Sequence, residues 1–278
     1  MTPRIINPVR LRLAAGEPVF AITITVPSAE IAAQAAQLGF DFLWVEMEHS
    51  PITLETLRTM VLATKGAPAA VFARVPVNEL WTAKRVLDAG AHGVIFPFTS
   101  TPKLARQAVD ACRYPPLGRR GSGPGLASLT WPDSEGSLAS AGGYHDSADA
   151  NVFVIAIVEE ARAVEKIDEI AATPGLDALF IGTSDLSFSL GLRGRQNDPL
   201  LSDAIAKIAA AAARHNVPLG RPASTPAQVA EWRKQGFAFF QLTTELGFLR
   251  AGARDFLSAA GRAPSASPTS QKGTGALY

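Results

Sequence analysis

Two carboxylates stand at the ends of apolar runs, in positions where they could hold a metal ion. Glu159 closes the run that begins VFVIAIV, and Asp185 comes just after the run LFIG. Such oxygen ligands suit a hard divalent cation, Mg²⁺ or Mn²⁺, which takes few protein carboxylates and leaves positions for substrate and water. The same two residues also fit a first-turn acid and a helix cap. A metal pair and a purely structural role are therefore both open.

An arginine and a histidine follow two other apolar runs. Arg74 in FARVP is placed to bind a carboxylate or to stabilise an enolate oxygen, although a salt-bridged rim residue would look the same. His49 in EMEHSP has Glu46 and Glu48 beside it, which would orient the ring for general-base catalysis. A histidine that is merely solvated or capping is the alternative reading of this segment.

Eight apolar runs, bounded by Gly, Pro, Asp or Asn, must position these side chains. The runs are almost continuously apolar rather than alternating, which is typical of parallel strands covered on both faces. They are Val19–Val26, Phe40–Met47, Ala70–Val75, His92–Phe98, Asn151–Glu159, Asp177–Gly182, Val217–Gly220 and Phe237–Leu242.

Helical segments alternate with these runs. In SAEIAAQAAQLG, for example, Ser28 can cap the start and Gly39 suits the end. About eight alternations favour an α/β fold, a (β/α)8 TIM barrel in a single domain. An open doubly wound sheet is the alternative if the weak run Val217–Gly220 is not a strand. In a barrel, the candidate residues above would face one mouth, because reactive groups gather at the carboxyl ends of the strands.

Composition narrows the class of protein. With 278 residues, 47% of them hydrophobic, the chain can bury the core of one such barrel. Its 26 basic and 25 acidic residues give a net charge of +1, so no overall field would draw it to nucleic acid or to a membrane, and a small-molecule partner is expected. The single cysteine, Cys112, excludes an internal disulfide and a cysteine-built zinc site. With no signal-peptide pattern and no run of about 20 apolar residues, a cytoplasmic protein is expected.

The chain divides into three parts. Residues 1–17 form an N-terminal segment, residues 18–261 the barrel, and residues 262–278 a tail whose low apolar content predicts disorder. One connection inside the barrel, Tyr114–Ala150, is long and rich in Gly, Pro, Ser and Asp. A segment of this kind is either a functional lid or interface loop, or a plain surface insertion.

Four stretches of sequence carry a resemblance to a known family. They are FDFLWVEMEHSP, the arginine of FARV, RYPPLGRRGSG, and IAIVEEARAVEKIDEIAATPGLDALFIGTSDLSFSLG. Together, from about Val19 to Leu249, they resemble the HpcH/HpaI aldolases, metal-dependent class II pyruvate aldolases of the phosphoenolpyruvate/pyruvate TIM-barrel superfamily. The resemblance implies a carbon-carbon lyase that cleaves or forms 4-hydroxy-2-oxo acids from pyruvate and an aldehyde, through a metal-stabilised pyruvate enolate.

The resemblance also implies roles for the candidate residues. Glu159 and Asp185 would ligate the divalent cation, Mg²⁺ or Mn²⁺, with Co²⁺ or Zn²⁺ as further possibilities. Arg74 would stabilise the enolate. His49 would be the general base, acting directly or through a bound water, with Glu46 as its partner.

Substrate binding and assembly are implied in the same way. Backbone amides around Gly182, Thr183 and Ser184 would hold the carboxylate of the substrate. Members of the family are hexamers in which a C-terminal helix, here Leu246–Leu257, docks on a neighbouring subunit. Arg119 would then approach the substrate in an adjacent active site.

Three departures from the family pattern and two rival functions remain. Glu46 stands where Asp is common, Ile157 where many members carry Gln, and Thr243–Glu245 in place of a Gly-Ser-Asp-like turn. One rival is a CoA-ester lyase of the citrate-lyase-β type, for which Arg119 and Arg120 would contact the CoA phosphates. The other is a barrel that binds keto acids without turning them over.

Overall fold

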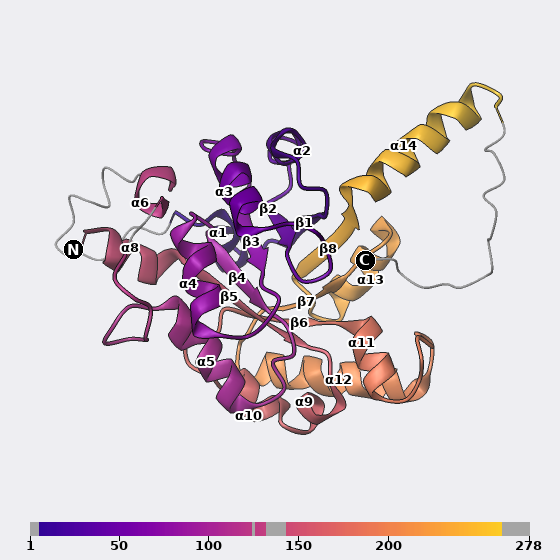
Figure 1. Ribbon diagram of the computed structural model, residues 1–278. Helices are drawn as coiled ribbons and strands as arrows, with labels where there is room; N and C mark the ends of the chain where they lie inside the picture. Colours follow the sequence, from indigo (N-terminus) through magenta and orange to yellow (C-terminus); the bar gives the residue numbers. More distant parts are fainter. Residues whose placement is uncertain (1–5, 124–125, 132–142, 263–278) are drawn as a thin grey trace.

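Eight parallel strands close into a barrel in the order of the sequence (Figure 1). The computed structural model describes residues 6–123, 126–131 and 143–262. The strands are β1 (Val19–Ile24), β2 (Phe42–Glu46), β3 (Ala70–Arg74), β4 (Gly93–Phe96), β5 (Phe153–Val158), β6 (Ala178–Ile181), β7 (Leu219–Pro222) and β8 (Phe239–Thr244). Because β8 pairs with β1, the TIM barrel is confirmed and the open doubly wound sheet is wrong.

Each of the eight predicted runs overlaps one strand. The weakest, Val217–Gly220, forms a strand two residues later than predicted, at Leu219–Pro222. Pro218 accounts for part of this shift, because proline has no N–H to donate to a neighbouring strand. Its carbonyl oxygen still accepts a hydrogen bond from the N–H of Leu179 in β6, at 2.9 Å.

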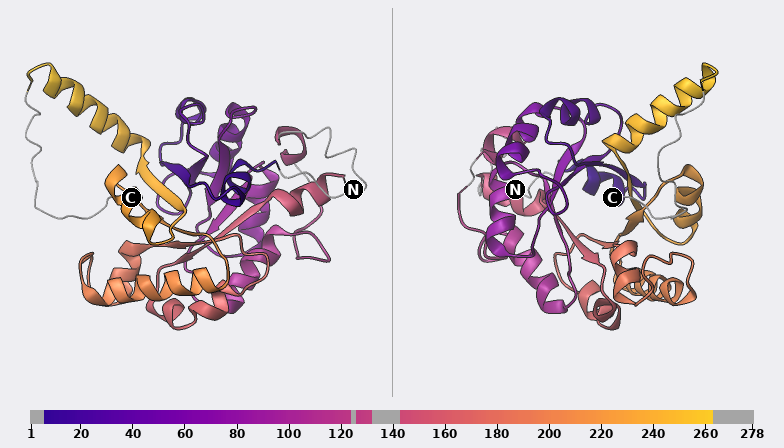
Figure 2. Two further views of the ribbon diagram at one scale, coloured as in Figure 1. Left: turned by 180° about the vertical axis from the view of Figure 1, so that it is seen from behind. Right: turned by 45° about the vertical axis from the view of Figure 1, so that its right-hand side comes forward.

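Helices surround the barrel, as the right-hand view of Figure 2 shows. After α1 (Pro8–Ala14) they are α2 (Ala29–Ala35), α3 (Leu54–Ala63), α4 (Leu80–Asp88), α5 (Pro102–Cys112), α6 (Ala127–Thr130), α8 (Gly143–Asn151), α9 (Ala161–Glu165), α10 (Ile167–Ala171), α11 (Thr183–Ser189), α12 (Pro199–Arg214), α13 (Pro226–Lys234) and α14 (Glu245–Ala259). The predicted cap is confirmed, since Ser28 Oγ accepts a hydrogen bond from the N–H of Ile31 at 3.2 Å. Within the described ranges, no helix is both long and apolar enough to cross a membrane.

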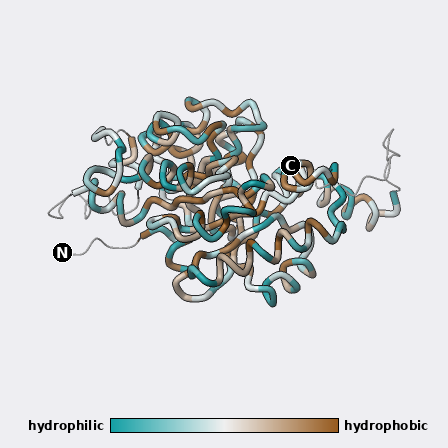
Figure 3. The backbone as a smooth tube through the Cα atoms, turned by 90° about the horizontal axis from the view of Figure 1, so that it is seen from below, coloured by the Kyte–Doolittle hydropathy of each residue, from teal (hydrophilic) through white to brown (hydrophobic). Residues whose placement is uncertain are grey.

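The interior of the barrel is filled with aromatic side chains. Phe42 lies 4.5 Å from Phe72 and 5.3 Å from Phe239, and Trp44 lies 4.9 Å from Phe180, all between ring centroids. A second apolar layer lies between the strands and the helices, and Figure 3 shows the hydrophobic segments concentrated in the middle of the molecule. Because side chains fill the interior, a site must lie at an end of the barrel, and in TIM barrels it lies at the carboxyl ends of the strands.

The N-terminal segment closes the opposite end. Val9 of α1 is 1% exposed and packs against the interior aromatic cluster. Asn7 accepts hydrogen bonds from the first turn of α1, and its N–H and side chain bond to Asn151 at the end of α8. The N-terminal segment is therefore part of the packed structure from Asn7 onward.

The described part of the long segment Tyr114–Ala150 also packs away from the carboxyl ends of the strands. Trp131 Nε1 donates to the carbonyl of Gly90 at 3.2 Å, and its ring stacks on His92 at 5.2 Å, both just before β4 begins. Residues 124–125 and 132–142 of this segment lie outside the described residues. What is described is thus not a lid over the barrel mouth of its own chain.

Helix α14 projects from the barrel instead of packing along it (Figures 1 and 2). None of its residues is buried, and Leu249 and Phe256 are 66% and 75% exposed. Near its start, Phe248 contacts Phe40 of the barrel, with ring centroids 5.7 Å apart. The tail predicted to be disordered lies outside the described residues from 263 onward.

The buried imidazole at the closed end makes stability depend on pH. Burial lowers the pKa of His92 to about 4, and its Nδ1 accepts a hydrogen bond from the N–H of Val71 at 3.3 Å. In the unfolded chain the pKa is about 6.5, so the folded state resists protonation and its stability falls as pH drops from about 6.5 towards 4. His92→Asn keeps an acceptor near Val71 and cannot titrate. We expect the free energy of unfolding of the wild type to fall more steeply than that of His92→Asn, by up to about 1.4 kcal/mol per pH unit.

Urea unfolding of both proteins at a series of pH values measures this difference. Parallel stability curves between pH 6.5 and 4.5 would contradict the assignment of His92 as a buried neutral group.

Candidate active site at the barrel mouth

The alternation of side chains along each strand delivers three charged groups to one place. Successive side chains of a strand point to opposite faces, so the residue two positions beyond an inward-facing side chain also faces inward. Glu46 comes two residues after the interior Trp44, and Glu159 two residues after the interior Ile157. Arg74 is directly paired with Glu46 in the register of β2 and β3. These three side chains therefore sit on top of the apolar interior, where the barrel opens.

The guanidinium of Arg74 is shared among three carboxylates. Its Nη1 lies 3.3 Å from Glu46 Oε2, and its Nη2 contacts Glu48 Oε2 and lies 3.6 Å from Glu159 Oε2. The side chain of Arg74 is only 5% exposed. A buried guanidinium requires partners of this kind, so each carboxylate fixes the position of the cation and is fixed by it.

Glu46 organises the turn that carries His49. Its Oε1 accepts hydrogen bonds from the N–H groups of Glu48 at 2.8 Å and His49 at 3.1 Å. Its Oε2 accepts from Trp44 Nε1 at 3.2 Å and from Arg74. With both oxygens engaged in this way, Glu46 holds the backbone of the turn and the guanidinium together.

The imidazole of His49 lies at the edge of the site. Its side chain is 47% exposed, and its Nε2 lies 3.5 Å from Glu48 Oε2. The carboxylate of Glu48 thus lies beside the ring, whereas Glu46 contacts the backbone N–H of His49. His49 lies beside the charged cluster and, like Glu46, is not among the residues that line the pocket at the mouth.

Glu159 is held at the centre of the site by the backbone around it. Its Oε1 accepts a hydrogen bond from the N–H of Phe98 at 2.6 Å, and Phe98 adopts a left-handed backbone conformation with a φ of 47°. A Cβ atom placed on Gly182 would lie 2.8 Å from Glu159 Oε2 and 2.9 Å from Glu159 Cβ. Position 182 therefore requires glycine, because any side chain there would displace the carboxylate.

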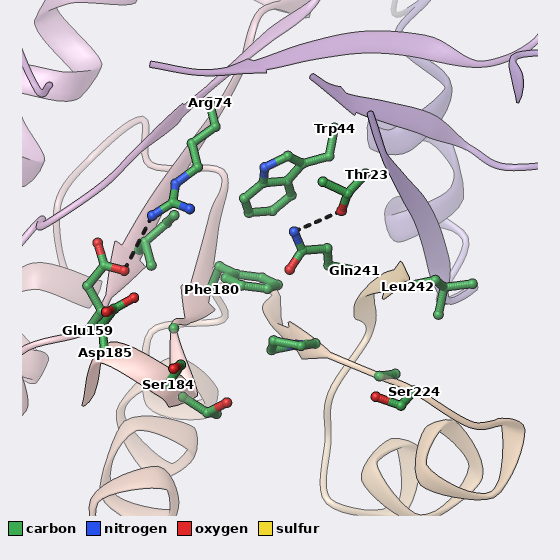
Figure 4. A pocket seen from close by; sticks show the side chains of 15 residues that line it. Thr23, Trp44, Arg74, Glu159, Phe180, Ser184, Asp185, Ser224, Gln241 and Leu242 are labelled. Carbon is green, nitrogen blue, oxygen red and sulfur yellow. Dashed lines mark hydrogen bonds and ion pairs between the residues drawn. The ribbon is translucent and has the colours of Figure 1, made fainter. Parts of the chain in front are cut away.

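Neither candidate ligand occupies the structural position given above as its alternative, although Asp185 is an acid in the first turn of α11. Glu159 precedes the N-cap of α9, which is Glu160, and so is not a first-turn acid. Asp185 is the third residue of α11, whose N-cap is Gly182 and has no side-chain cap. Figure 4 shows Asp185 directly beside Glu159, with Arg74 facing them. The two carboxylates thus emerge from the end of β5 and from the first turn of α11 into one place.

Crowding of carboxylates leaves the site short of positive charge. Burial raises the pKa of Glu159 to about 7; Arg74 and the N–H of Phe98 oppose this, while Glu48 and Asp185 add to it. Burial also raises the pKa of Glu48 to about 7, against the effect of Arg74 and with that of Glu46 and Asp185. One guanidinium does not balance four carboxylates, so a further cation would stabilise their charged forms.

The donor set fits a hard cation bound by few protein ligands. Within the described ranges, no three Asp, Glu, His or Cys side chains gather closely enough to hold an ion between them. Mg²⁺ is commonly bound by one or two carboxylates, with the other positions taken by water and substrate oxygens. Glu159 and Asp185 meet that requirement, and with Cys112 buried elsewhere the site offers no thiolate for a softer ion.

The mouth opens into a pocket that sequence reasoning described only in part. Of the predicted site residues, the structure brings Arg74, Glu159, Asp185 and the stretch 182–184 to its lining. The other residues in the lining were not predicted as site residues: Thr23, Trp44, Ile157, Phe180, Pro222, Ala223, Ser224, Gln241 and Leu242. Several of them lie on the inward-facing positions of their strands, so counting by twos from the interior aromatic residues would have found them.

Arg119 does not join this pocket within one chain. It lies in a separate surface pocket beside α5, with Lys103 and Arg106, and its N–H donates to the carbonyl of Asp110 at 2.7 Å. Arg120 is 1% exposed and pairs with Asp88 at 2.9 Å, at the end of α4. Neither arginine contacts the barrel mouth of its own chain.

The rim segment after β8 has a structural role. Glu245 Oε1 accepts hydrogen bonds from the N–H groups of Thr25 at 2.8 Å and Val26 at 2.6 Å. Thr244 caps α14 by accepting from the N–H of Gly247 at 3.1 Å. This segment ties the loop after β1 to the start of α14.

Comparison with known proteins places the chain among enzymes. The family model described as HpcH/HpaI aldolase/citrate lyase matches residues 24–251. The chain is 33% identical to a hydroxypyruvate/pyruvate aldolase of Paraburkholderia phytofirmans, over 90% of this chain and 96% of that protein. It is 35% identical to a 2-dehydro-3,6-dideoxy-6-sulfogluconate aldolase of Pseudomonas putida, over 84% and 88%. Among solved structures, an HpcH/HpaI aldolase/citrate lyase family protein from Burkholderia cenocepacia is similar, with a TM-score of 0.83, 32% identity, and coverage of 92% and 100%.

The contact between Gly182 and Glu159 can be tested by one substitution. Gly182→Ala places a Cβ against the carboxylate and should displace it, weakening Mn²⁺ binding by about ten-fold or more, as is usual when a metal ligand is misplaced. Gly123→Ala is the matched control, because nothing lies within 4 Å of its added Cβ. Calorimetric titration with Mn²⁺ measures the effect, and circular dichroism checks the fold. Equal Mn²⁺ affinity in a folded Gly182→Ala protein would contradict the proposed packing.

Proposed function

The chain belongs to the HpcH/HpaI aldolase/citrate lyase family, and on that premise we propose that it is a class II pyruvate aldolase. It cleaves 4-hydroxy-2-oxo acids to pyruvate and an aldehyde, and forms them in the reverse direction. The observation that carries the proposal is the gathering of Arg74, Glu159 and Asp185 in one pocket at the mouth of the barrel. Two ligands and a fixed guanidinium are what a 2-oxo acid requires, since it presents a carboxylate and a neighbouring carbonyl oxygen.

Glu159 and Asp185 are the proposed ligands of a divalent cation, Mg²⁺ or Mn²⁺. Their support is the excess of carboxylates over cations at the mouth, and the raised pKa of Glu159 that accompanies it. When bound, the cation supplies Lewis-acid polarisation of the carbonyl of the 2-oxo acid. Co²⁺ and Zn²⁺ also accept oxygen ligands and are part of the proposal as alternative ions.

The chain's own groups bind the substrate and stabilise its charge. The backbone amides of residues 182–184 would hold the carboxylate of the 2-oxo acid, and no side chain caps α11 in competition. Arg74 would face the carbonyl oxygen on which negative charge develops during cleavage. It is already held in place by Glu46 and Glu48, so it would not have to reorganise as that charge forms.

The proton transfer is assigned to His49. In the cleavage direction it would take the proton of the C4 hydroxyl while the bond between C3 and C4 breaks. The electron pair of that bond passes to the pyruvate half as an enolate, and the other half leaves as the aldehyde. The proton taken up by His49 would then return to C3, directly or through water, which completes pyruvate. Glu48 would orient the ring, and Glu46 would act as a positioning residue through the backbone of the turn.

Removal of the metal tests this function directly. We expect pyruvate release from 4-hydroxy-2-oxo acids to fall to about 1% or less after chelation and to return on addition of Mn²⁺ or Mg²⁺, because the cation polarises the reacting carbonyl. A coupled assay with lactate dehydrogenase measures the pyruvate. Asp185→Asn should resemble the chelated enzyme even with excess metal. Full activity after complete metal removal would overturn the mechanism.

Two rival functions receive less support. A CoA-ester lyase would need a site for CoA phosphates, and the arginines considered for it, Arg119 and Arg120, do not reach the mouth of their own chain. The named relatives given above are aldolases. A barrel that only binds keto acids would bind pyruvate tightly and release none from any substrate, which the same assay detects.

Assembly into a homo-oligomer, a hexamer in the family pattern, belongs to the proposal. Its support is the projecting α14, with Leu249 and Phe256 exposed while Phe248 packs on its own barrel. A cytoplasmic location is proposed as well, supported by a single buried thiol at Cys112.

Charge placed on the exposed stripe of α14 tests the assembly. Leu249→Asp and Phe256→Asp should each lower the molar mass in solution, because a carboxylate would be buried without a partner at a subunit contact. Ser258→Asp adds the same charge on the opposite side of the helix and should leave the mass unchanged. Light scattering after size-exclusion chromatography measures the mass. A hexamer that persists in both variants would exclude this stripe as the contact.

A further inference from the structure

The pocket at the barrel mouth has two chemically different walls (Figure 4). One wall carries Arg74, Glu159 and Asp185, the groups assigned above to the 2-oxo acid. The opposite wall carries Thr23 and Gln241. Its hydrogen-bonding groups are neutral, and the proposed reaction so far gives them no role.

Gln241 is the first polar side chain of β8, after two phenylalanines. It faces inward from β8, two residues after Phe239, which belongs to the interior cluster. Its Nε2 donates to Thr23 Oγ1 at 3.0 Å, and Thr23 is 3% exposed. The amide is therefore anchored at one end, while its carbonyl group is directed into the pocket (Figure 4).

Apolar side chains separate the two walls. Trp44 and Phe180 lie between them (Figure 4), and with Ile157 they line the pocket and belong to the interior cluster beneath it. Trp44 Nε1 donates to Glu46, so the indole offers the pocket no hydrogen-bonding group of its own. A substrate that spans the pocket thus meets charge at one end, an apolar surface in the middle and an amide at the other end.

The amide wall has no cation for an anionic substrate tail. Arg74 is the single cationic side chain in the lining of this pocket, and three carboxylates already share it. Arg221 lies on neighbouring β7 but is paired in register with Phe240, and its guanidinium stacks on Trp232 at 3.7 Å, away from the pocket. A carboxylate, sulfonate or phosphate on the tail would be desolvated beside these acids without a counter-ion from the same chain.

We propose that Gln241, oriented by Thr23, forms the acceptor subsite and recognises a hydroxyl group on the aldehyde half of the substrate. The aldehyde class is then a neutral hydroxyaldehyde, in preference to an alkyl aldehyde or one with an anionic tail. A hydroxyl group both donates and accepts, so either end of the amide can bind it. An alkyl aldehyde would leave the amide unpaired when the pocket closes around it. This inference rests on the proposed aldolase function, because it assigns the half of the substrate that pyruvate does not occupy.

Aldol addition of pyruvate to a matched pair of aldehydes tests the subsite. Glycolaldehyde and acetaldehyde differ by one hydroxyl group, and glyoxylate supplies an anionic acceptor. We expect Gln241→Met, which keeps the length of the side chain without its hydrogen-bonding groups, to reduce the ratio of kcat/KM for glycolaldehyde over acetaldehyde by about ten-fold. Gln37→Met is the matched control on an exposed turn and should leave the ratio as in the wild type.

Thr23→Val provides a second, independent variant. It removes the anchor of the amide and should lower the same ratio by a smaller factor, because Gln241 then samples other orientations. In the wild type, glyoxylate should give a lower kcat/KM than glycolaldehyde. The subsite is wrong if Gln241→Met and Thr23→Val both keep the wild-type ratio, or if glyoxylate is the better acceptor.

NMR can monitor the exchange of the methyl protons of pyruvate with D₂O in the absence of any aldehyde. This measurement tests the proposed aldolase function separately from the acceptor subsite. Exchange in the wild type and in Gln241→Met shows that the enolate forms, so an unchanged aldehyde ratio then overturns only the acceptor subsite. Absence of metal-dependent exchange in the wild type would overturn the aldolase function itself, and the subsite with it.

Discussion

The site depends on one buried guanidinium. Arg74 would be costly to bury alone, and three carboxylates converge on it: Glu46 at the end of β2, Glu48 in the turn that follows, and Glu159 just after β5. The three acids and Asp185 outnumber it, so the balance of charge favours one more cation. That imbalance links a structural requirement of the barrel mouth to the chemistry of a metal-dependent lyase. The guanidinium and the carboxylates are held in place before any substrate arrives, as electrostatic catalysis requires.

The barrel supplies the positions of these groups through a simple regularity. Inward-facing residues alternate along every strand, and the packed aromatic interior fixes which residues they are. The next inward-facing positions after Trp44 and Ile157, two residues further along, are Glu46 and Glu159, where the apolar interior ends. The same two-residue spacing on β8, from Phe239 to Gln241, places Gln241 on the opposite side of the pocket. The pocket is therefore an extension of the core pattern, with polar residues at the final inward positions.

Much of this was predictable from the sequence, for physical reasons. Parallel strands that are covered on both faces have almost continuously apolar sequences, so the apolar runs predicted all eight strands. The acidic residues at the ends of two runs, Glu46 and Glu159, indicated which end of the barrel carries the site. Contacts within the turn after β2 were less predictable, because spacing puts Glu46 and Glu48 equally near His49, and only the direction of the side chains separates their roles. Gln241 was missed because a lone polar residue in a strand gives no motif. The position of Arg119 depends on how a long irregular segment folds, which short-range patterns do not determine.

The most direct test of the account is a crystal structure of the enzyme soaked with Mn²⁺ and pyruvate, with anomalous diffraction to locate the metal. The account predicts one Mn²⁺ bound by Glu159 and Asp185, with a carbonyl oxygen of pyruvate within reach of Arg74 and the wall formed by Thr23 and Gln241 left open for the aldehyde. A folded, active crystal in which Mn²⁺ binds elsewhere, or in which pyruvate lies away from Arg74, would contradict it.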